Sequence, residues 1–257
     1  MNETKHEITC VINNDHSDLQ AANSGYSQNG YVLNMVCGYG SNDHLFAALW
    51  KKNSENDRIY RTGLTESELG MSIASLKEEG WFIVSLNGYT LKDAHFFNAT
   101  WSRNNNKENE VIYGLSKDDL NNFYGQMNRK GLSPLDICCY GSKSVPQFAG
   151  IWGESHGEDS VCHVDLSGVD LQEYNKDLTA RGFQMDNLNG SCYNEMPKYS
   201  AIWNKKDDFE LNFDIALSAD DFINSKMEMR KRQYYPTSVS GFTARSKNYF
   251  AVVWQKY

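Results

Sequence analysis

The chain has 257 residues, of which 40% are hydrophobic and 13% aromatic, and its formal net charge is −8. This composition allows a substantial core, and the negative charge argues against nucleic acid or an anionic membrane as a partner. No apolar run approaches the length of a membrane span. Six scattered cysteines without paired metal spacing favour reduced thiols, and we expect a cytoplasmic protein.

The first predicted elements, in chain order, are a strand at 7–12, a weak helix at 15–30, an alternating strand at 31–39 and a short strand at 46–50. The same four elements then recur along the chain. Tryptophans end each copy with a constant spacing of 51 residues, at Trp50, Trp101, Trp152, Trp203 and Trp254. Such a period indicates one structural unit repeated five times. The units cover about 7–52, 58–103, 109–154, 160–205 and 211–257, and together form a single domain over 1–257.

Each helix is predicted from a start signal that recurs in four copies. Leu64 and Thr65 are followed by Glu68, and the same pattern of leucine, hydroxyl residue and acid begins at Leu115, Leu166 and Leu217. This is the pattern of a capping box with a hydrophobic residue in front of it. Glycines at Gly80, Gly131 and Gly182 are placed to end helices of about four turns. Strands at 59–62, 111–113, 161–164 and 211–215 precede these helices.

The strand after each helix, at 31–39, 81–89, 132–140, 183–191 and 234–242, has two different faces. One column is uniformly apolar: Val36, Leu86, Ile137, Leu188 and Val239. The columns beside it, on the opposite face, are mixed or polar. We therefore expect one face against the helix and the other toward a wetter environment. The aromatic pair of each short strand, such as Phe46 and Trp50, is expected in the core.

The chain begins with a strand that aligns with those preceding the helices, and it ends after a tryptophan strand. We expect strand 7–13 to complete the last unit, in one sheet with residues 234–242 or 250–254. That exchange would close the units into a pseudo-five-fold ring. The predicted fold is an α+β repeat of five strand-helix-strand-strand units, similar to an α/β-propeller.

The hairpin pattern Val36-Cys37-Gly38-Tyr39 with residues 46–50, followed by residues 64–69, resembles a known family. It is similar to the bacterial tandem repeat in the N-terminal region of fungal polyglycine hydrolases. Weaker matches extend the resemblance over all five copies. The resemblance implies the repeat architecture and a non-catalytic accessory role. Those hydrolases also carry a serine hydrolase domain, but this chain contains no Ser-x-x-Lys, so the nucleophile motif is missing.

Residues that differ between the copies are the better candidates for a functional site. If the polar strand face looks into the centre of the ring, a shared ligand cavity is expected there. Its lining would be Ser85, Asn87, Asp136, Cys138, Asn187, Asn189 and Ser238. Asp136 is the acid of this set and is the residue on which we expect binding to depend. The alternative is that these groups satisfy one another around a water-filled hole.

The candidates for catalytic and metal-binding residues are weaker than those for a ligand cavity. Asp136, Cys138 and His163 could form a set of orienter, thiol and base, as in a small-molecule hydrolase. His44 and His95 occupy equivalent positions and could share a metal, although no third ligand is visible. No phosphate loop or His-Glu-x-x-His motif is present, so we expect no cofactor. Whether the chain is an enzyme stays open from the sequence.

Three hypotheses of function remain. The first is a soluble module that binds a small molecule, a glycan or a protein, through the central pocket or through polar loops such as 104–109 gathered on one rim. The second is a small-molecule enzyme that uses the central residues. The third is a scaffold without a ligand.

Overall fold

The first unit contains four elements in the predicted order. The computed structural model describes residues 7–52, 57–103, 109–142, 145–154, 159–205 and 210–256. Strand β1 (Ile8–Asn14) precedes helix α1 (His16–Gln28), and the hairpin of β2 (Tyr31–Tyr39) and β3 (Leu45–Lys52) follows. The three strands form an antiparallel sheet in the order β1-β3-β2. Each unit is therefore a three-stranded sheet with one helix.

The other four units repeat this arrangement. Their first strands and helices are β4 (Arg58–Leu64), α2 (Glu66–Glu78), β7 (Glu110–Leu115), α3 (Lys117–Arg129), β10 (Ser160–Leu166), α4 (Gly168–Ala180), β13 (Leu211–Leu217) and α5 (Ala219–Lys231). Their hairpins are β5 (Phe82–Leu91) with β6 (Ala94–Ser102), β8 (Leu132–Ser142) with β9 (Val145–Glu154), β11 (Phe183–Tyr193) with β12 (Met196–Lys205), and β14 (Tyr234–Ala244) with β15 (Lys247–Lys256). In every unit the second strand of the hairpin lies in the middle of the sheet.

The predicted capping signals determine where the helices begin and end. The side chains of Thr65 and Ser167 each form a reciprocal capping box with the acid three residues later. In the other three units an Asp or Ser side chain accepts the backbone N–H three residues on. The glycines that follow α1 to α4 have positive φ values between 73° and 85°, which only glycine adopts without strain. Each helix is therefore held to 13 residues.

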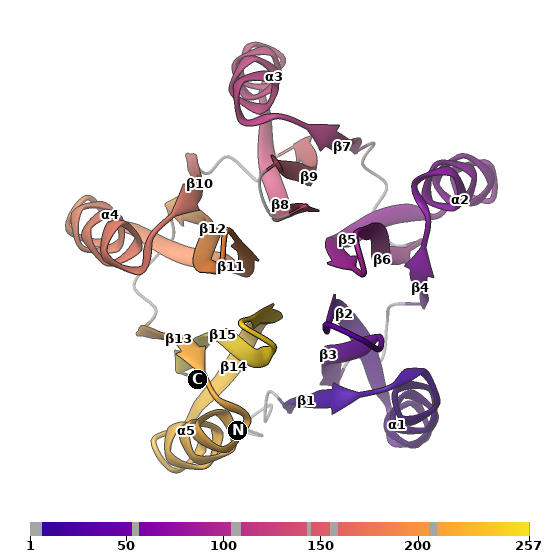
Figure 1. Cartoon of the computed structure of the whole chain (residues 1–257), viewed down its shortest axis with the longest axis vertical. Helices are drawn as coiled ribbons and strands as arrows, with labels where there is room; N and C mark the ends of the chain where they lie inside the picture. The colour runs from indigo at the N-terminus through magenta and orange to yellow at the C-terminus, as the bar shows by residue number, and fades with distance from the viewer. Residues whose placement is uncertain are drawn as a thin grey trace, which may run out of the picture.

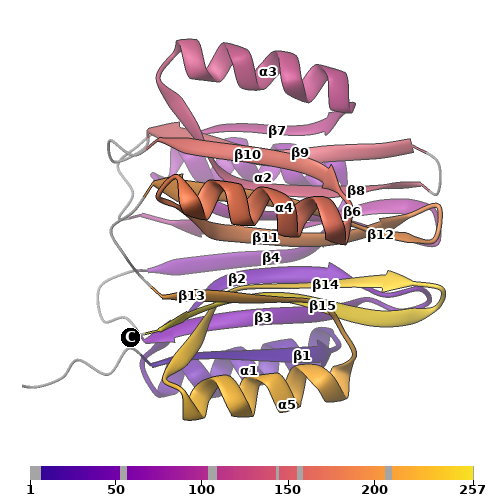
Figure 2. The same cartoon turned by 90° about the vertical axis from the view of Figure 1, so that its left-hand side faces the viewer.

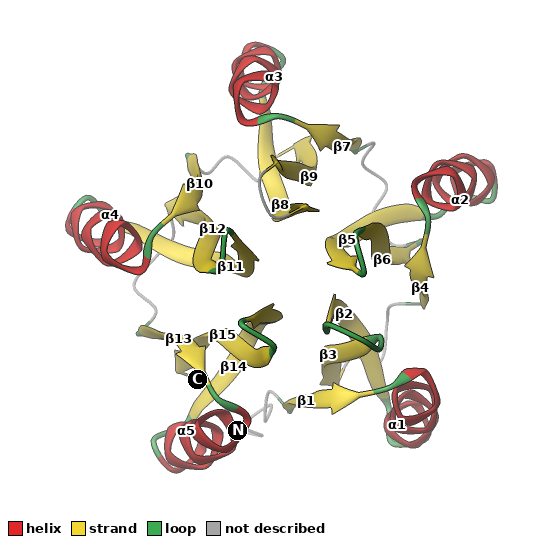
Figure 3. Ribbon diagram, in the orientation of Figure 1, coloured by secondary structure: helices red, strands yellow, loops and turns green. Residues whose placement is uncertain are grey.

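The five units stand around a common axis, with the hairpin strands toward the centre and the helices at the periphery (Figures 1 and 3). Figure 2 shows the strands running along this axis, with the β-hairpin turns at one end of the molecule. Strands β2, β5, β8, β11 and β14 are innermost, and each contacts its counterparts in the neighbouring units. The axis is therefore lined by one strand from each unit, which we call the inner strands.

The core confirms the assignment of the repeated aromatic residues. The five tryptophans at 51-residue spacing are at most 1% exposed, and so are four of the five aromatic residues that precede them by four positions. Tyr199, the fifth, is 2% exposed. The apolar column of the inner strands is also buried. Alternation in the middle strand of each sheet thus places these rings inside, as the period of two predicts.

The expectation that the N-terminal strand completes the last unit is wrong. β1 pairs with β3 of its own unit, and the fifth unit has its own first strand, β13, which pairs with β15. Every sheet therefore forms from one continuous segment of the chain. Contacts between the first and last units are instead made by side chains, including the rings of Tyr39 and Phe250, whose centroids are 5.4 Å apart.

Candidate functional site

Polar side chains of the inner strands bind the backbone of the neighbouring unit. Asn87 Oδ1 accepts the N–H of Gly38 at 2.8 Å, and Cys138 Sγ accepts the N–H of Gly88 at 3.0 Å. The same contact joins Gly190 to Ser240 at 2.9 Å, and Gly241 of the last unit to Cys37 of the first at 3.3 Å. This column of the inner strands does not face a wetter space, contrary to our expectation. Its side chains are buried, and four of them accept backbone N–H groups of a neighbouring unit, whereas Oδ1 of Asn189 has no hydrogen-bond partner.

Asp136 joins three units through its carboxylate. Oδ2 accepts the backbone N–H of Leu86 from the second unit at 2.8 Å. Oδ1 accepts the N–H of Ile137 at 2.9 Å and the side-chain amide of Asn187, from the fourth unit, at 2.8 Å. The side chain is buried, and burial raises its pKa to about 6 although all of these donors favour the charged form. Asp136 thus links three units through hydrogen bonds. Burial disfavours its charged form, and the surrounding donors offset part of that effect.

A polar cavity of about 360 Å³ lies between the inner strands, and its lining residues are near the strand ends opposite the hairpin turns. We call it the axial cavity. It is lined by Asn34, Met35, Lys51, Val84, Ser85, Leu135, Asp136, Asp186, Asn187, Thr237, Ser238 and Gln255. Four of the predicted ligand-binding residues, Ser85, Asp136, Asn187 and Ser238, meet in this wall. All five units contribute to it, and it contains four of the seven residues predicted for a shared cavity.

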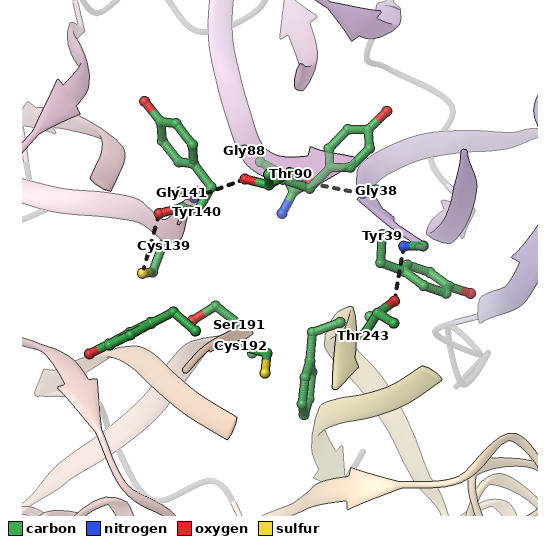
Figure 4. A pocket seen from close by; sticks show the side chains of 17 residues that line it. Gly38, Tyr39, Gly88, Thr90, Cys139, Tyr140, Gly141, Ser191, Cys192 and Thr243 are labelled. Carbon is green, nitrogen blue, oxygen red and sulfur yellow. Dashed lines mark hydrogen bonds between the residues drawn. The ribbon is translucent and has the colours of Figure 1, made fainter. Parts of the chain in front are cut away.

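The other predicted residues lie elsewhere. Asn87 lines a smaller cavity of about 80 Å³ at the hairpin end of the axis (Figure 4). Cys138 and Asn189 are buried between the inner strands and line neither cavity. Sequence reasoning missed the residues at the β-bulges of the inner strands, among them Asn34, Asp186 and Thr237. An extra residue at a bulge breaks strict alternation, so the period of two gave no sign that these side chains reach the cavity.

The hairpin-end cavity is small because aromatic rings fill the space between the units. A Cβ added to Gly38, Gly88, Gly190 or Gly241 would lie 2.3–2.6 Å from the ring at the following position in the next unit. These rings are Tyr89, Tyr140, Phe242 and Tyr39. Figure 4 shows the rings of Tyr39 and Tyr140 directed away from the centre of the cavity. The glycines therefore allow the close approach of neighbouring inner strands.

One junction uses a different pair of residues. Between the third and fourth units, Cys139 replaces the glycine and Ser191 replaces the aromatic residue. Burial raises the pKa of the Cys139 thiol to about 12, against the effect of its hydrogen bond with Ser191. A larger side chain on one strand thus accompanies a smaller one on its neighbour, which conserves volume at the junction.

The proposed catalytic set does not occupy one site. Asp136 lines the axial cavity, and the Cys138 thiol is enclosed, donating to the carbonyl of Ala149. His163 lies in the outer layer, where its ring stacks on Tyr174 of α4 with centroids 4.0 Å apart. Burial raises the pKa of Cys138 well above its ordinary range, so the thiolate is disfavoured. The described residues provide no geometry for a thiol activated by this histidine.

The two equivalent histidines have separate partners. His44 Nδ1 lies 2.5 Å from the hydroxyl of Tyr89, and His95 Nδ1 lies 3.0 Å from the hydroxyl of Thr90. Among the residues that the structure describes, no group of three or more histidine, cysteine, aspartate or glutamate side chains is arranged to hold a metal ion. Residues 104–108 of the expected recognition loop lie outside the described residues. No described helix combines the length and apolar character needed to cross a membrane.

Comparison with known proteins supports the repeat assignment. The sequence model of the family described as polyglycine hydrolase-like, structural repeat, matches five segments, at 12–53, 57–104, 109–155, 157–206 and 216–257. The five matches fall on the five units and cover most of the chain. No curated protein matches the chain.

Proposed function

This chain belongs to the family of polyglycine hydrolase-like structural repeats, and on that premise we propose that it is a binding module for a small polar molecule. The ligand occupies the axial cavity, whose volume of about 360 Å³ is large enough for a molecule the size of a monosaccharide or an amino acid. A cavity with converging polar groups is where a ligand is expected on a rigid scaffold. The enzyme alternative gains no support from the positions of Asp136, Cys138 and His163.

The observation that carries this proposal is the side-chain amide of Asn187. Its Nδ2 donates to Asp136 at 2.8 Å, which fixes the orientation of the amide. Its Oδ1 is buried and has no hydrogen-bond partner. An unsatisfied buried acceptor costs about 1–3 kcal/mol, and a ligand that supplies a donor would recover part of this. We therefore expect a ligand that carries hydroxyl or ammonium donors.

The test uses glucose, glycerol and glycine as probes, with calorimetric titration and thermal unfolding as measurements. At least one probe is expected to bind at a single site and to raise the unfolding temperature. Asn187→Ala should remove that binding, whereas Asn122→Ala, at an exposed position of α3 away from the axis, should leave it unchanged. Binding that survives Asn187→Ala, or no saturable binding by any probe, would contradict the axial site.

The cytoplasmic location stays a prediction from the cysteine content. Fractionation of cells that express the full-length protein is the direct measurement. Recovery of the protein outside the cytoplasmic fraction would show that the prediction is wrong.

A further inference from the structure

In three units the tryptophan that ends the unit donates its indole N–H to an acceptor in the outer layer. Trp50 donates to Asn23 at 3.0 Å, and Trp203 donates to Asn175 at 3.0 Å. In the fifth unit Trp254 donates to Asp214 at 2.9 Å. The acceptor thus comes either from the helix or from the first strand of the same unit. Because the units are copies, they serve as internal comparisons for one another.

The third unit lacks this acceptor. Tyr124 stands at the position of Asn23 and Asn175, and Ile112 stands at the position of Asp214. The side chain of Trp152 is fully buried, and its Nε1 has no hydrogen-bond partner. Buried donors are nearly always satisfied in folded proteins, so an unpartnered one requires an explanation.

A cavity of about 340 Å³ lies beside this indole, between the third and fourth units. We call it the outer groove. Helix α3 contributes Leu120, Asn121 and Tyr124, and β10 and α4 of the next unit contribute residues 162–166, Asp170 and Tyr174. Trp152 is part of the lining. The residue that carries the unpartnered donor therefore contributes to the wall of a space that is large enough for a small molecule.

The wall of the outer groove is aromatic and its charges are largely compensated. The rings of His163 and Tyr174 stack with centroids 4.0 Å apart, and Tyr124 lines the cavity as well. Lys117 pairs with Asp165 at 2.9 Å, so neither charge is free to attract a counter-ion. Burial lowers the pKa of His163, which favours the neutral ring. The flat aromatic walls suit a planar ligand, and the Asp170 carboxylate in the same lining disfavours an anionic one.

The corresponding groove between the fifth and first units has a different character. It is lined by Cys10, Val11, Ile12, Phe222, Ile223, Lys226, Met227 and Arg230, and Lys226 Nζ donates to the carbonyl of Cys10 at 2.7 Å. The tryptophan of the fifth unit, Trp254, is not part of this lining and has an acceptor within its unit. The combination of an unpartnered indole donor with aromatic walls is therefore a feature of the groove between units three and four.

We propose that the outer groove binds a small, neutral, planar molecule that carries a hydrogen-bond acceptor, such as an aromatic amide, and that the acceptor receives the indole N–H of Trp152. This site is separate from the axial cavity and does not depend on the function proposed above.

Nicotinamide is a suitable probe because it is planar, neutral and carries a carbonyl acceptor. In nitrogen-15 NMR spectra, the indole signal of Trp152 should shift saturably with nicotinamide, whereas the indole signal of Trp50, in the first unit, should stay in place. Trp152→Phe removes the donor and keeps an aromatic ring, and it should weaken binding at least tenfold. Trp50→Phe is the matched control and should leave the affinity unchanged, because Trp50 lies in the first unit.

A second variant tests the role of the missing acceptor. Tyr124→Asn restores the residue found in the first and fourth units, so the indole of Trp152 should gain an internal partner and its nicotinamide-dependent shift should disappear. Equal shifts of all indole signals, no saturable shift, or equal affinities of Trp152→Phe and the parent protein would each overturn the proposal. If a bound water molecule accepts the indole N–H of Trp152, no saturable shift is expected.

Discussion

At the scale of single residues, the repeat allows the same side chain to be compared in five settings. The indole N–H of Trp203 has a partner in Asn175, whereas that of Trp152 has none. Both rings are fully buried. A comparison of the two positions therefore separates the contribution of one hydrogen bond to stability from the contribution of burying the ring.

Replacement of each tryptophan by phenylalanine should show this difference. Both variants lose the same ring volume, but Trp203→Phe also leaves the Asn175 side chain without its donor. We expect Trp203→Phe to lower the free energy of unfolding by about 1–2 kcal/mol more than Trp152→Phe does. Urea unfolding of both variants measures this quantity. A larger loss for Trp152→Phe would mean that its indole has a partner in the free protein.

Asp136 should make stability depend on pH in a direction opposite to that of an ordinary surface acid. Its pKa of about 6 in the folded protein exceeds the unfolded value near 3.9. The folded state then binds more protons between these values, so the free energy of unfolding decreases as pH rises from about 4 to about 6. Two units of pKa correspond to about 3 kcal/mol. Asp136→Asn should remove this decrease, as measured by urea unfolding across that range.

Asp170 provides the matched control. Its pKa is lowered by hydrogen bonds from Ser167 in the capping box, so its contribution is present above the unfolded pKa and is lost as pH falls. Asp170→Asn should therefore reduce stability at neutral pH and have little effect in strong acid. If both variants showed the same pH profile, the burial of Asp136 would not determine its pKa.

At the scale of elements, packing between inner strands depends on pairs of residues rather than on single positions. Four junctions combine a glycine with an aromatic ring, and the junction of units three and four combines Cys139 with Ser191. Because the added volume and the removed volume lie at the same contact, the two changes compensate each other. Substitutions at such a pair should therefore not be additive.

Transfer of this pair to the next junction tests the point. A Cβ on Gly190 would lie 2.4 Å from the ring of Phe242, so Gly190→Cys should cost about 1–3 kcal/mol of stability. Phe242→Ser should cost about 3–5 kcal/mol, because it leaves a cavity. The double variant should lose clearly less than the sum, as measured by a double-mutant cycle of unfolding. Strict additivity would show that the two residues do not share a contact.

At the scale of the whole molecule, the first and last units are joined by side chains and not by an exchanged strand. Gly241 donates to Cys37, Gly40 donates to Thr243 at 3.1 Å, and Lys226 donates to the carbonyl of Cys10. Each sheet is complete within its unit. The boundaries between units are therefore the places where the chain can be reopened with the smallest loss of local structure.

Two circular permutants, with the natural ends joined by a short Gly/Ser linker, measure this directly. One begins at Glu210, between units, and ends at residue 209. The other begins at Trp81, between α2 and β5, and ends at Gly80. We expect the first to unfold near the temperature of the parent protein and the second several degrees lower, because its cut divides a unit. Failure of the first permutant to fold would contradict the contact between units five and one.

The sequence by itself determined the unit and its local structure. The 51-residue period, the capping residues such as Thr65 and Ser167, and the glycines after the helices specify elements through contacts within a few residues of the chain. The burial of the tryptophans followed in the same way from alternation along a strand. Four residues of the axial cavity, with Asp136 among them, also followed, because equivalent positions of a repeat meet at the axis.

The tertiary structure alone decided which strands pair with one another and which polar groups line a cavity. A repeat can be divided at different points, and the period is the same whether β1 completes the first sheet or the last. The short connection through α1 and β2 brings β3 beside β1, which favours pairing within the unit. Likewise, Cys138 and Asn189 have the spacing of cavity residues, but close packing of the inner strands encloses them. The outer groove beside Trp152 is formed by two neighbouring units together, so no single copy of the sequence reveals it.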